Sequence, residues 1–153
     1  VKIEGGREHE EIFRVLASND INVCGHLGLQ PQLVIDSSDY KIQGRDKDSS
    51  KLIMSDAILL ESLGISVLVL ECVPSDLAKN VSSKIGIPTI GIGAGNGCDG
   101  QVLVSYDMLG ITSGRQPRFV RNFMTSEDSI SSAVSAFVRE VKAGTFPSES
   151  ESY

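Results

Sequence analysis

The most constraining feature of the chain is the run SVLVL at residues 66–70, in which four apolar residues follow Ser66 without interruption. A strand with one face in water would alternate apolar and polar residues. A continuous apolar run is instead typical of a strand buried on both faces, as in a parallel sheet covered by helices. The segment therefore predicts a sheet interior, for which the rest of the chain has to supply covering helices.

Strand and helix patterns alternate along the rest of the chain. Repeated strand–helix order predicts an α/β fold with a parallel sheet. A long loop is expected over residues 27–46, and the polar tail SESESY is expected to be loose. The predicted strands are residues 1–4, 21–25, 66–70, 89–93 and 101–104. The predicted helices are residues 7–17, 49–63, 74–85 and 129–142.

The length of the chain limits the possible architectures. A chain of 153 residues is long enough for one domain with a substantial core, and no linker divides it, so residues 1–153 are expected to form a single domain. Five strands can form an open doubly wound sheet. They can equally form the last five strands of a (β/α)8 barrel, which needs about 250 residues when complete. Because the chain enters an apolar run at Val1, we expect upstream sequence to be missing.

Composition excludes several classes of protein. The net charge of −6 argues against a nucleic-acid binder, which would show a basic face. No apolar run approaches the roughly 20 residues that span a bilayer, and no signal or transit peptide is visible. The cysteines Cys24, Cys72 and Cys98 are widely spaced, which is not the pattern of a disulfide framework. We therefore expect a cytoplasmic protein that binds neither nucleic acid nor membrane.

Polar residues gather where the predicted strands end. Lys2 and Glu4 lie two residues apart on the first strand and so point to the same face. His26 lies just past the second strand, and Glu71 follows SVLVL directly. One such residue alone could equally cap a helix or form a surface ion pair. Four of them at three successive strand ends favour a shared site, because the carboxyl ends of strands carry the sites of α/β folds.

The chemistry of these four residues is coherent. Glu4 offers a hard oxygen ligand that suits Mg²⁺, and Lys2 offers a positive charge for a carboxylate. His26 can donate or accept a hydrogen bond near neutral pH. Apolar neighbours on both sides of Glu71 should leave its carboxylate poorly solvated and therefore more basic, as a general base working near neutral pH requires. Together the residues suit proton abstraction next to a carbonyl, with a metal ion stabilising the enolate.

Two other kinds of site are less consistent with the sequence. The segment at residues 95–100 matches G-x-G-x-x-G, but a dinucleotide-binding loop must open a helix and here the strand-like QVLV follows. The glycines are better explained by a tight connection and a close approach of the backbone to a ligand. A zinc site at Cys24 and His26 with Cys72 or Cys98 would lack the closely paired ligands of structural zinc.

Several motifs, in order along the chain, resemble those of the ketopantoate hydroxymethyltransferase family. They are VKIEGG, GHLGLQPQ, YKIQGRD, LVLECVP, IPTIGIGAGNGCDGQVLV and DMLG, with PRFVRNF and GTFPSESE near the end. The resemblance covers nearly the whole chain and corresponds to the second half of the family's sequences. It implies an incomplete (β/α)8 TIM-type barrel, of which this chain holds about the last five strands.

The resemblance also implies an activity. The family transfers a hydroxymethyl group from 5,10-methylenetetrahydrofolate to 3-methyl-2-oxobutanoate, which gives ketopantoate in pantothenate biosynthesis. It uses Mg²⁺ or another divalent metal and forms a homo-oligomer, a ring-like decamer. Residue by residue, the resemblance implies that Glu4 is a metal ligand and that Lys2 contacts the oxo acid. It makes Glu71 the proton acceptor and places His26 in the lining of the substrate site.

The sequence also departs from the family's pattern. The family's other metal ligands are two aspartates on earlier strands, one of them in a GDS-type motif that is absent here. The site is therefore expected to be partial and the isolated chain inactive. One alternative is another metal-enolate barrel, such as a lyase, although GHLGLQPQ and LECVP argue against it. A second alternative is a non-catalytic α/β binding module, which a compact and soluble monomer would favour.

Overall fold

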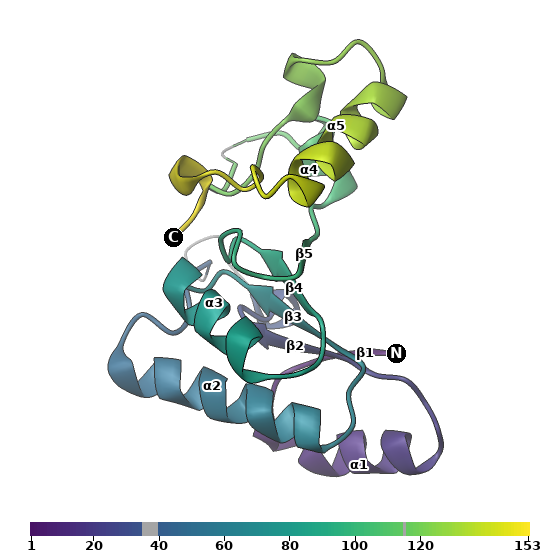
Figure 1. The fold of residues 1–153 in the computed structure, drawn as a ribbon, viewed down its shortest axis with the longest axis vertical. Coiled ribbons are helices and arrows are strands. Elements are labelled where there is room, and N and C mark those ends of the chain that lie inside the picture. The colour runs from purple at the N-terminus through teal and green to yellow at the C-terminus, as the bar shows by residue number, and fades with distance from the viewer. Residues whose placement is uncertain (35–39, 115) are drawn as a thin grey trace.

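The computed structural model describes residues 1–34, 40–114 and 116–153 (Figure 1). Its centre is a five-stranded sheet in which every neighbouring pair is parallel. The order of the strands in space is their order in the chain. The strands are β1 (Lys2–Glu4), β2 (Cys24–Gly28), β3 (Val67–Glu71), β4 (Thr89–Ile92) and β5 (Gly100–Gln101).

This strand order decides between the two architectures that the sequence allows. A doubly wound sheet reverses its strand order at one point and carries helices on both faces. Here the order never reverses, and three helices lie along one side of the sheet (Figure 1). The arrangement is that of five consecutive strands of a (β/α)8 barrel, as predicted. These helices are α1 (Glu10–Ser18), α2 (Lys47–Ser62) and α3 (Ser75–Lys84).

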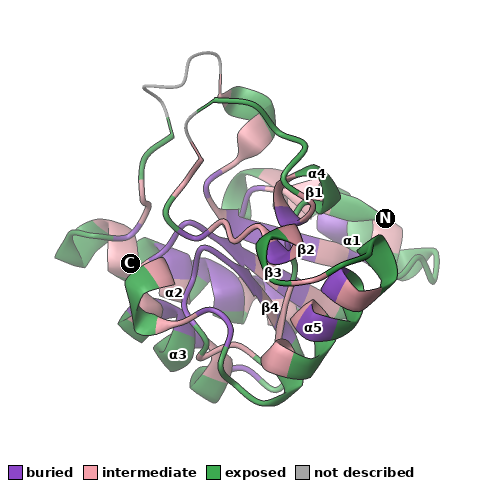
Figure 2. Cartoon of the chain, turned by 90° about the horizontal axis from the view of Figure 1, so that it is seen from above, coloured by how far each residue is buried: buried purple, intermediate pink, exposed green. Residues whose placement is uncertain are grey.

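The main core lies between the sheet and these helices. Alternate residues of β2 and β3 point toward the helices, and Leu68 and Leu70 are completely buried there. Leu60 of α2 and Val81 of α3 meet them from the helix side. Figure 2 shows the buried residues concentrated along the strands, with exposed residues on the outer faces of the helices. None of the helices in the described parts of the chain has the length and apolar content that a membrane span needs.

A second core cluster joins the carboxyl ends of the strands to the C-terminal segment. That segment contains α4 (Ser105–Met108) and α5 (Ile130–Lys142). The rings of Phe123 and Phe146 pack edge to face with their centroids 5.4 Å apart. Cys72 and Ile92 contribute to the same cluster from the sheet.

The prediction of a loose polar tail is wrong. Residues Glu149–Glu151 form a 3-10 turn, and the carboxylate of Glu151 accepts two hydrogen bonds of 2.6 Å from Arg121. The ring of Tyr153 packs edge to face on Phe119. A bidentate arginine–carboxylate pair between segments far apart in the chain orders the tail.

Element boundaries differ from the predictions where capping or pairing decides them. Helix α2 begins at Lys47, two residues earlier than predicted, because the carboxylate of Asp46 accepts hydrogen bonds from the backbone amides of Asp48 and Ser49, at 3.0 and 2.9 Å.

Three other elements also differ from the predictions. The helix expected from residue 7 opens with a 3-10 turn, Arg7–His9. Strand β5 is shorter than predicted. The expected loop 27–46 contains the end of β2 and a 3-10 turn, Pro31–Leu33, and its residues 35–39 lie outside the described residues.

The largest correction concerns β2, which lies three residues later than predicted. Its register with β3 pairs Leu27 with Leu70 and Gly28 with Glu71. Ile21, which the prediction placed in the strand, is 41% exposed, whereas Leu27 is 4% exposed in the core. His26 therefore lies inside the strand and not beyond its end.

Gly28 makes a close backbone approach that we expect no other residue to allow. Its φ is +98°, and a β-carbon there would lie 2.1 Å from the carbonyl oxygen of Glu71. Gly114 has a similar φ of +92° but no described atom within 4 Å of such a β-carbon. Gly114→Ala should therefore cost about 1 kcal/mol of unfolding free energy, from backbone strain alone.

Gly28→Ala should cost roughly 2 kcal/mol more than Gly114→Ala, because β2 must also move away from β3. Urea denaturation of the two variants and the unaltered protein measures the difference. Equal losses in the two variants would contradict the close approach.

Candidate functional site

Strands β1, β2 and β3 bring Glu4, His26 and Glu71 to one face of the sheet. The parallel register pairs Glu4 with His26. On β3, His26 pairs with Val69, so Glu71 lies two residues further along on the same face. Their chain neighbours point the other way, into the core on the helix side: Ile3, Leu27 and Leu70. The face that carries the three ionisable groups is therefore the one that a complete barrel turns inward.

The ring of His26 lies between the two carboxylates. Its Nε2 is 3.2 Å from Glu71 Oε2, and its Nδ1 is 3.7 Å from Glu4 Oε1. His26 is 1% exposed and Glu71 is 6% exposed, so both are shielded from water. Neither ring nitrogen makes a hydrogen bond of good geometry within the described part of the chain. The contact at 3.2 Å has the right length for a hydrogen bond but not the right angle.

Lys2 and the loop after β2 hold the Glu4 carboxylate. Lys2 Nζ donates a hydrogen bond to Glu4 Oε1 at 3.0 Å, and the backbone amide of Gln32 donates one to Glu4 Oε2 at 3.3 Å. Burial alone would raise the pKa of Glu4. The hydrogen bonds from Lys2 and Gln32, with the charge of Lys2, outweigh burial and hold the pKa of Glu4 below its usual value. The structure thus favours the ionised carboxylate, which is the form that binds a metal ion.

Tyr40 is a site residue that the sequence reasoning did not single out. Burial, and after it the negative charge of Glu71, raise the pKa of Tyr40 to about 12. Its hydroxyl is therefore a protonated donor beside the Glu71 carboxylate. The motif YKIQGRD contains this tyrosine, but nothing in the motif indicates that it approaches a residue 31 positions further along the chain.

The described residues fit a divalent cation only as part of a larger set of ligands. Among them, no group of three or more His, Cys, Asp or Glu side chains is placed to hold a metal. Glu4 offers one ionised carboxylate on the inner face, and the unpartnered nitrogens of His26 beside it indicate a polar region. Glu4 would therefore supply one oxygen ligand, and the remaining ligands would come from other groups.

The glycine-rich loop contacts a helix instead of surrounding an open site. A β-carbon at Gly97 would lie 2.8 Å from the β-carbon of Lys79, and one at Gly95 would lie 2.5 Å from the hydroxyl of Ser75. Both contact residues belong to α3. The loop leads into β5, a strand, as predicted. The close approach expected of these glycines is thus to α3 rather than to a ligand.

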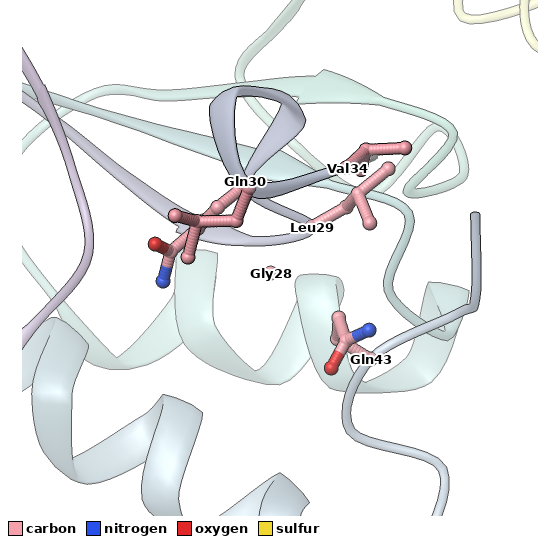
Figure 3. Close-up of a pocket in the computed structure, with 6 residues that line it drawn as sticks. Gly28, Leu29, Gln30, Val34 and Gln43 are labelled. Atoms are coloured by element: carbon pink, nitrogen blue, oxygen red, sulfur yellow. The ribbon is translucent and has the colours of Figure 1, made fainter. Parts of the chain in front are cut away.

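A small cavity of about 210 Å³ opens beside the end of β2 (Figure 3). In Figure 3 the side-chain amides of Gln30 and Gln43 flank Gly28, and Leu29 and Val34 lie on a third side. The cavity is smaller than the roughly 300 Å³ at which ligand pockets usually begin. Its lining residues are Gly28, Leu29, Gln30, Leu33, Val34 and Gln43.

The structure thus brings together the four residues that the sequence selected. Lys2, Glu4, His26 and Glu71 form one chain of contacts from β1 to β3. The prediction that they share a cavity is not met by the cavity beside Gly28, because none of the four lines it.

Comparison with known proteins gives a consistent result. A family model described as ketopantoate hydroxymethyltransferase matches residues 1–149. The whole chain is 58% identical to the 3-methyl-2-oxobutanoate hydroxymethyltransferase of Ruthia magnifica, of which it covers 59%. It is 49% identical to the protein of that name from Erwinia tasmaniensis and 47% identical to that from a Thermoanaerobacter species, covering 58% and 56% of them. The chain thus spans less than two thirds of the length of these curated relatives.

The contacts of Glu4 predict how it titrates. Lys2→Met removes a hydrogen bond and a positive charge, so the pKa of Glu4 should rise. Carboxyl carbon NMR of the labelled protein over a pH titration measures the shift. Arg14→Met is the control, because it breaks a salt bridge to Glu10 on the surface of α1 and should leave Glu4 unchanged. A pKa of Glu4 that does not respond to Lys2→Met would contradict the geometry.

Proposed function

The chain belongs to the ketopantoate hydroxymethyltransferase family, and from that membership we propose that it works as part of a hydroxymethyltransferase. The proposed reaction moves a one-carbon unit from 5,10-methylenetetrahydrofolate to 3-methyl-2-oxobutanoate and gives ketopantoate for pantothenate biosynthesis. The observation that carries the proposal is the line of Glu4, His26 and Glu71 across three strands on the inner face. The match over residues 1–149 weakens the lyase and binding-module alternatives.

Glu71 is the proposed proton acceptor. It is the last residue of β3, and its carboxylate is almost entirely shielded from water. In this position it can take the C3 proton of the oxo acid, next to the carbonyl. Shielding from water keeps the base poorly solvated. General bases of this kind contribute typically about 10² to 10⁴ in rate.

Lys2 and Glu4 are the proposed binding groups. The Lys2 side chain is 47% exposed, so its ammonium can turn from Glu4 toward the carboxylate of an incoming oxo acid. Glu4 is held ionised, as a ligand for Mg²⁺ must be. When bound, the divalent cation would act as a Lewis acid toward the carbonyl of the oxo acid. With the cation at Glu4 and the base at Glu71, the two carboxylates have different tasks.

Three further features of the proposal come from the sequence and the family resemblance. These are a cytoplasmic enzyme, a homo-oligomer with the family's ring-like decamer as its form, and Mg²⁺ as the metal. We also expect the 153-residue chain by itself to be inactive, because Glu4 is the only one of the family's metal ligands that the resemblance places on it. Assay of the isolated chain for ketopantoate formation tests that expectation, and turnover would refute it.

The roles of the two carboxylates can be separated in the full-length protein that contains this chain. Glu71→Gln keeps the shape of the side chain but removes the base, so kcat should fall by roughly 10² to 10⁴ with little change in metal affinity. Glu4→Gln should weaken metal binding, so added Mg²⁺ should partly restore its rate. The measurements are ketopantoate formation over a metal titration and exchange of the C3 proton into deuterated water.

Glu10→Gln provides the control, since this carboxylate binds Arg14 on the surface of α1 and should not affect either assay. Full exchange and turnover by Glu71→Gln would refute the assignment of the base. Rescue of Glu71→Gln, and not of Glu4→Gln, by excess metal would show that the two roles are reversed.

A further inference from the structure

We propose that His26 is a positioning residue for Glu71, holding one oxygen of that carboxylate through its Nε2–H, and that it does not itself contact the substrate. The inference rests on the proposed function, in which Glu71 is the proton acceptor. It changes the role that the sequence suggested for His26, which was to line the substrate site. The evidence is the location of the ring, the pairing of its nitrogens and its burial.

The backbone fixes the location of the ring. His26 lies in the middle of β2, paired with Glu4 of β1 on one side and with Val69 of β3 on the other. Its carbonyl accepts a further hydrogen bond of 3.0 Å from the amide of Gly5. Because β2 is hydrogen-bonded to β1 and to β3, it cannot shift without breaking the sheet. The ring is 1% exposed, which leaves almost no surface for a substrate atom.

The pairing of the ring nitrogens is asymmetric. Nε2 lies within hydrogen-bond range of Glu71 Oε2 at 3.2 Å, whereas Nδ1 lies beyond that range from Glu4 Oε1 at 3.7 Å. A buried polar atom without a partner costs roughly 1–3 kcal/mol. A small rotation of the Glu71 carboxylate would align it with Nε2, and that nitrogen would then no longer be without a hydrogen-bond partner. The distances therefore favour a proton on Nε2, directed at Glu71.

This hydrogen bond has a consequence for the reaction. A glutamate carboxylate rotates about three side-chain bonds, so an unrestrained base would spend much of its time turned away from the substrate. A bond from Nε2 to Oε2 would restrain the side chain, so that Oε1 can face the substrate and accept the C3 proton. Misplacement of a reacting group by about 1 Å can cost on the order of 10² in rate. Loss of the bond should therefore lower kcat and leave substrate binding nearly unchanged.

Two substitutions distinguish a hydrogen-bond donor at the place of Nε2 from one at the place of Nδ1. In His26→Gln the side-chain amide nitrogen can occupy the place of Nε2, so a donor to Glu71 is retained. In His26→Asn the amide nitrogen lies near the place of Nδ1, so that donor is lost. In the full-length protein that contains this chain, His26→Asn should lower kcat and C3 proton exchange on the order of 10²-fold. His26→Gln should stay within about tenfold of the unaltered protein, and both variants should keep KM for the oxo acid within about threefold.

Several outcomes would overturn the positioning role. Equal rates in the two variants would do so, as would a large rise in KM at unchanged kcat, which would mark His26 as a substrate contact. If the unaltered protein shows neither proton exchange nor ketopantoate formation, the proposed function fails and the role of His26 fails with it. If the unaltered protein is active but His26→Asn and His26→Gln have equal rates, only the positioning role is refuted and the proposed function stands.

A second measurement does not depend on how the variants fold. Nitrogen NMR of the histidine-labelled, unaltered protein reports which ring nitrogen carries the proton. The signals of His26 are identified by their absence in His26→Gln or, should that variant not fold, by their coupling to the backbone. We expect a protonated Nε2, and its signal should shift in Glu71→Gln. A proton found on Nδ1 alone would overturn the inference.

Discussion

The parallel pairing of β1, β2 and β3 is the constraint on which the candidate site depends. Glu4, His26 and Glu71 lie 22 and 45 residues apart in the sequence, and only the strand register makes them neighbours. Because side chains alternate along a strand, a slip of one residue in β2 would turn His26 into the core and Leu27 onto the inner face. The burial of Leu27 against the helices thus fixes the orientation of His26.

The site holds two carboxylates in a mostly buried position, and different groups contact each of them. Glu4 is supported by Lys2 and by the Gln32 amide, so its charged form is favoured. The Glu71 side chain is 8% exposed, close to the 10% of Glu4, and the groups beside its carboxylate are His26 and Tyr40 instead of a lysine. Two carboxylates on one face therefore sit in different surroundings, which is how proteins give such groups different tasks.

Features that depend on local sequence could be predicted, and features that depend on distant contacts could not. The burial of β3 is visible in the apolar run at residues 66–70, and the parallel sheet follows from the alternation of elements. The alternation alone did not distinguish a barrel from a doubly wound sheet, and the family resemblance favoured the barrel. The position of β2 was missed because Gly28 is required by a carbonyl on another strand. The ordered tail depends on Arg121, 30 residues from Glu151, and the place of Tyr40 beside Glu71 depends on the fold of a loop.

The most direct test of the candidate site is a crystal structure of the full-length protein that contains this chain, with 3-methyl-2-oxobutanoate bound. The C3 atom of the oxo acid should lie within about 3.5 Å of the Glu71 carboxylate, as a reacting pair requires. The carboxylate of the oxo acid should lie near Lys2, and Nε2 of His26 should remain on the other oxygen of Glu71. An oxo acid bound on the helix side of the sheet, or with C3 far from Glu71, would contradict the site described here.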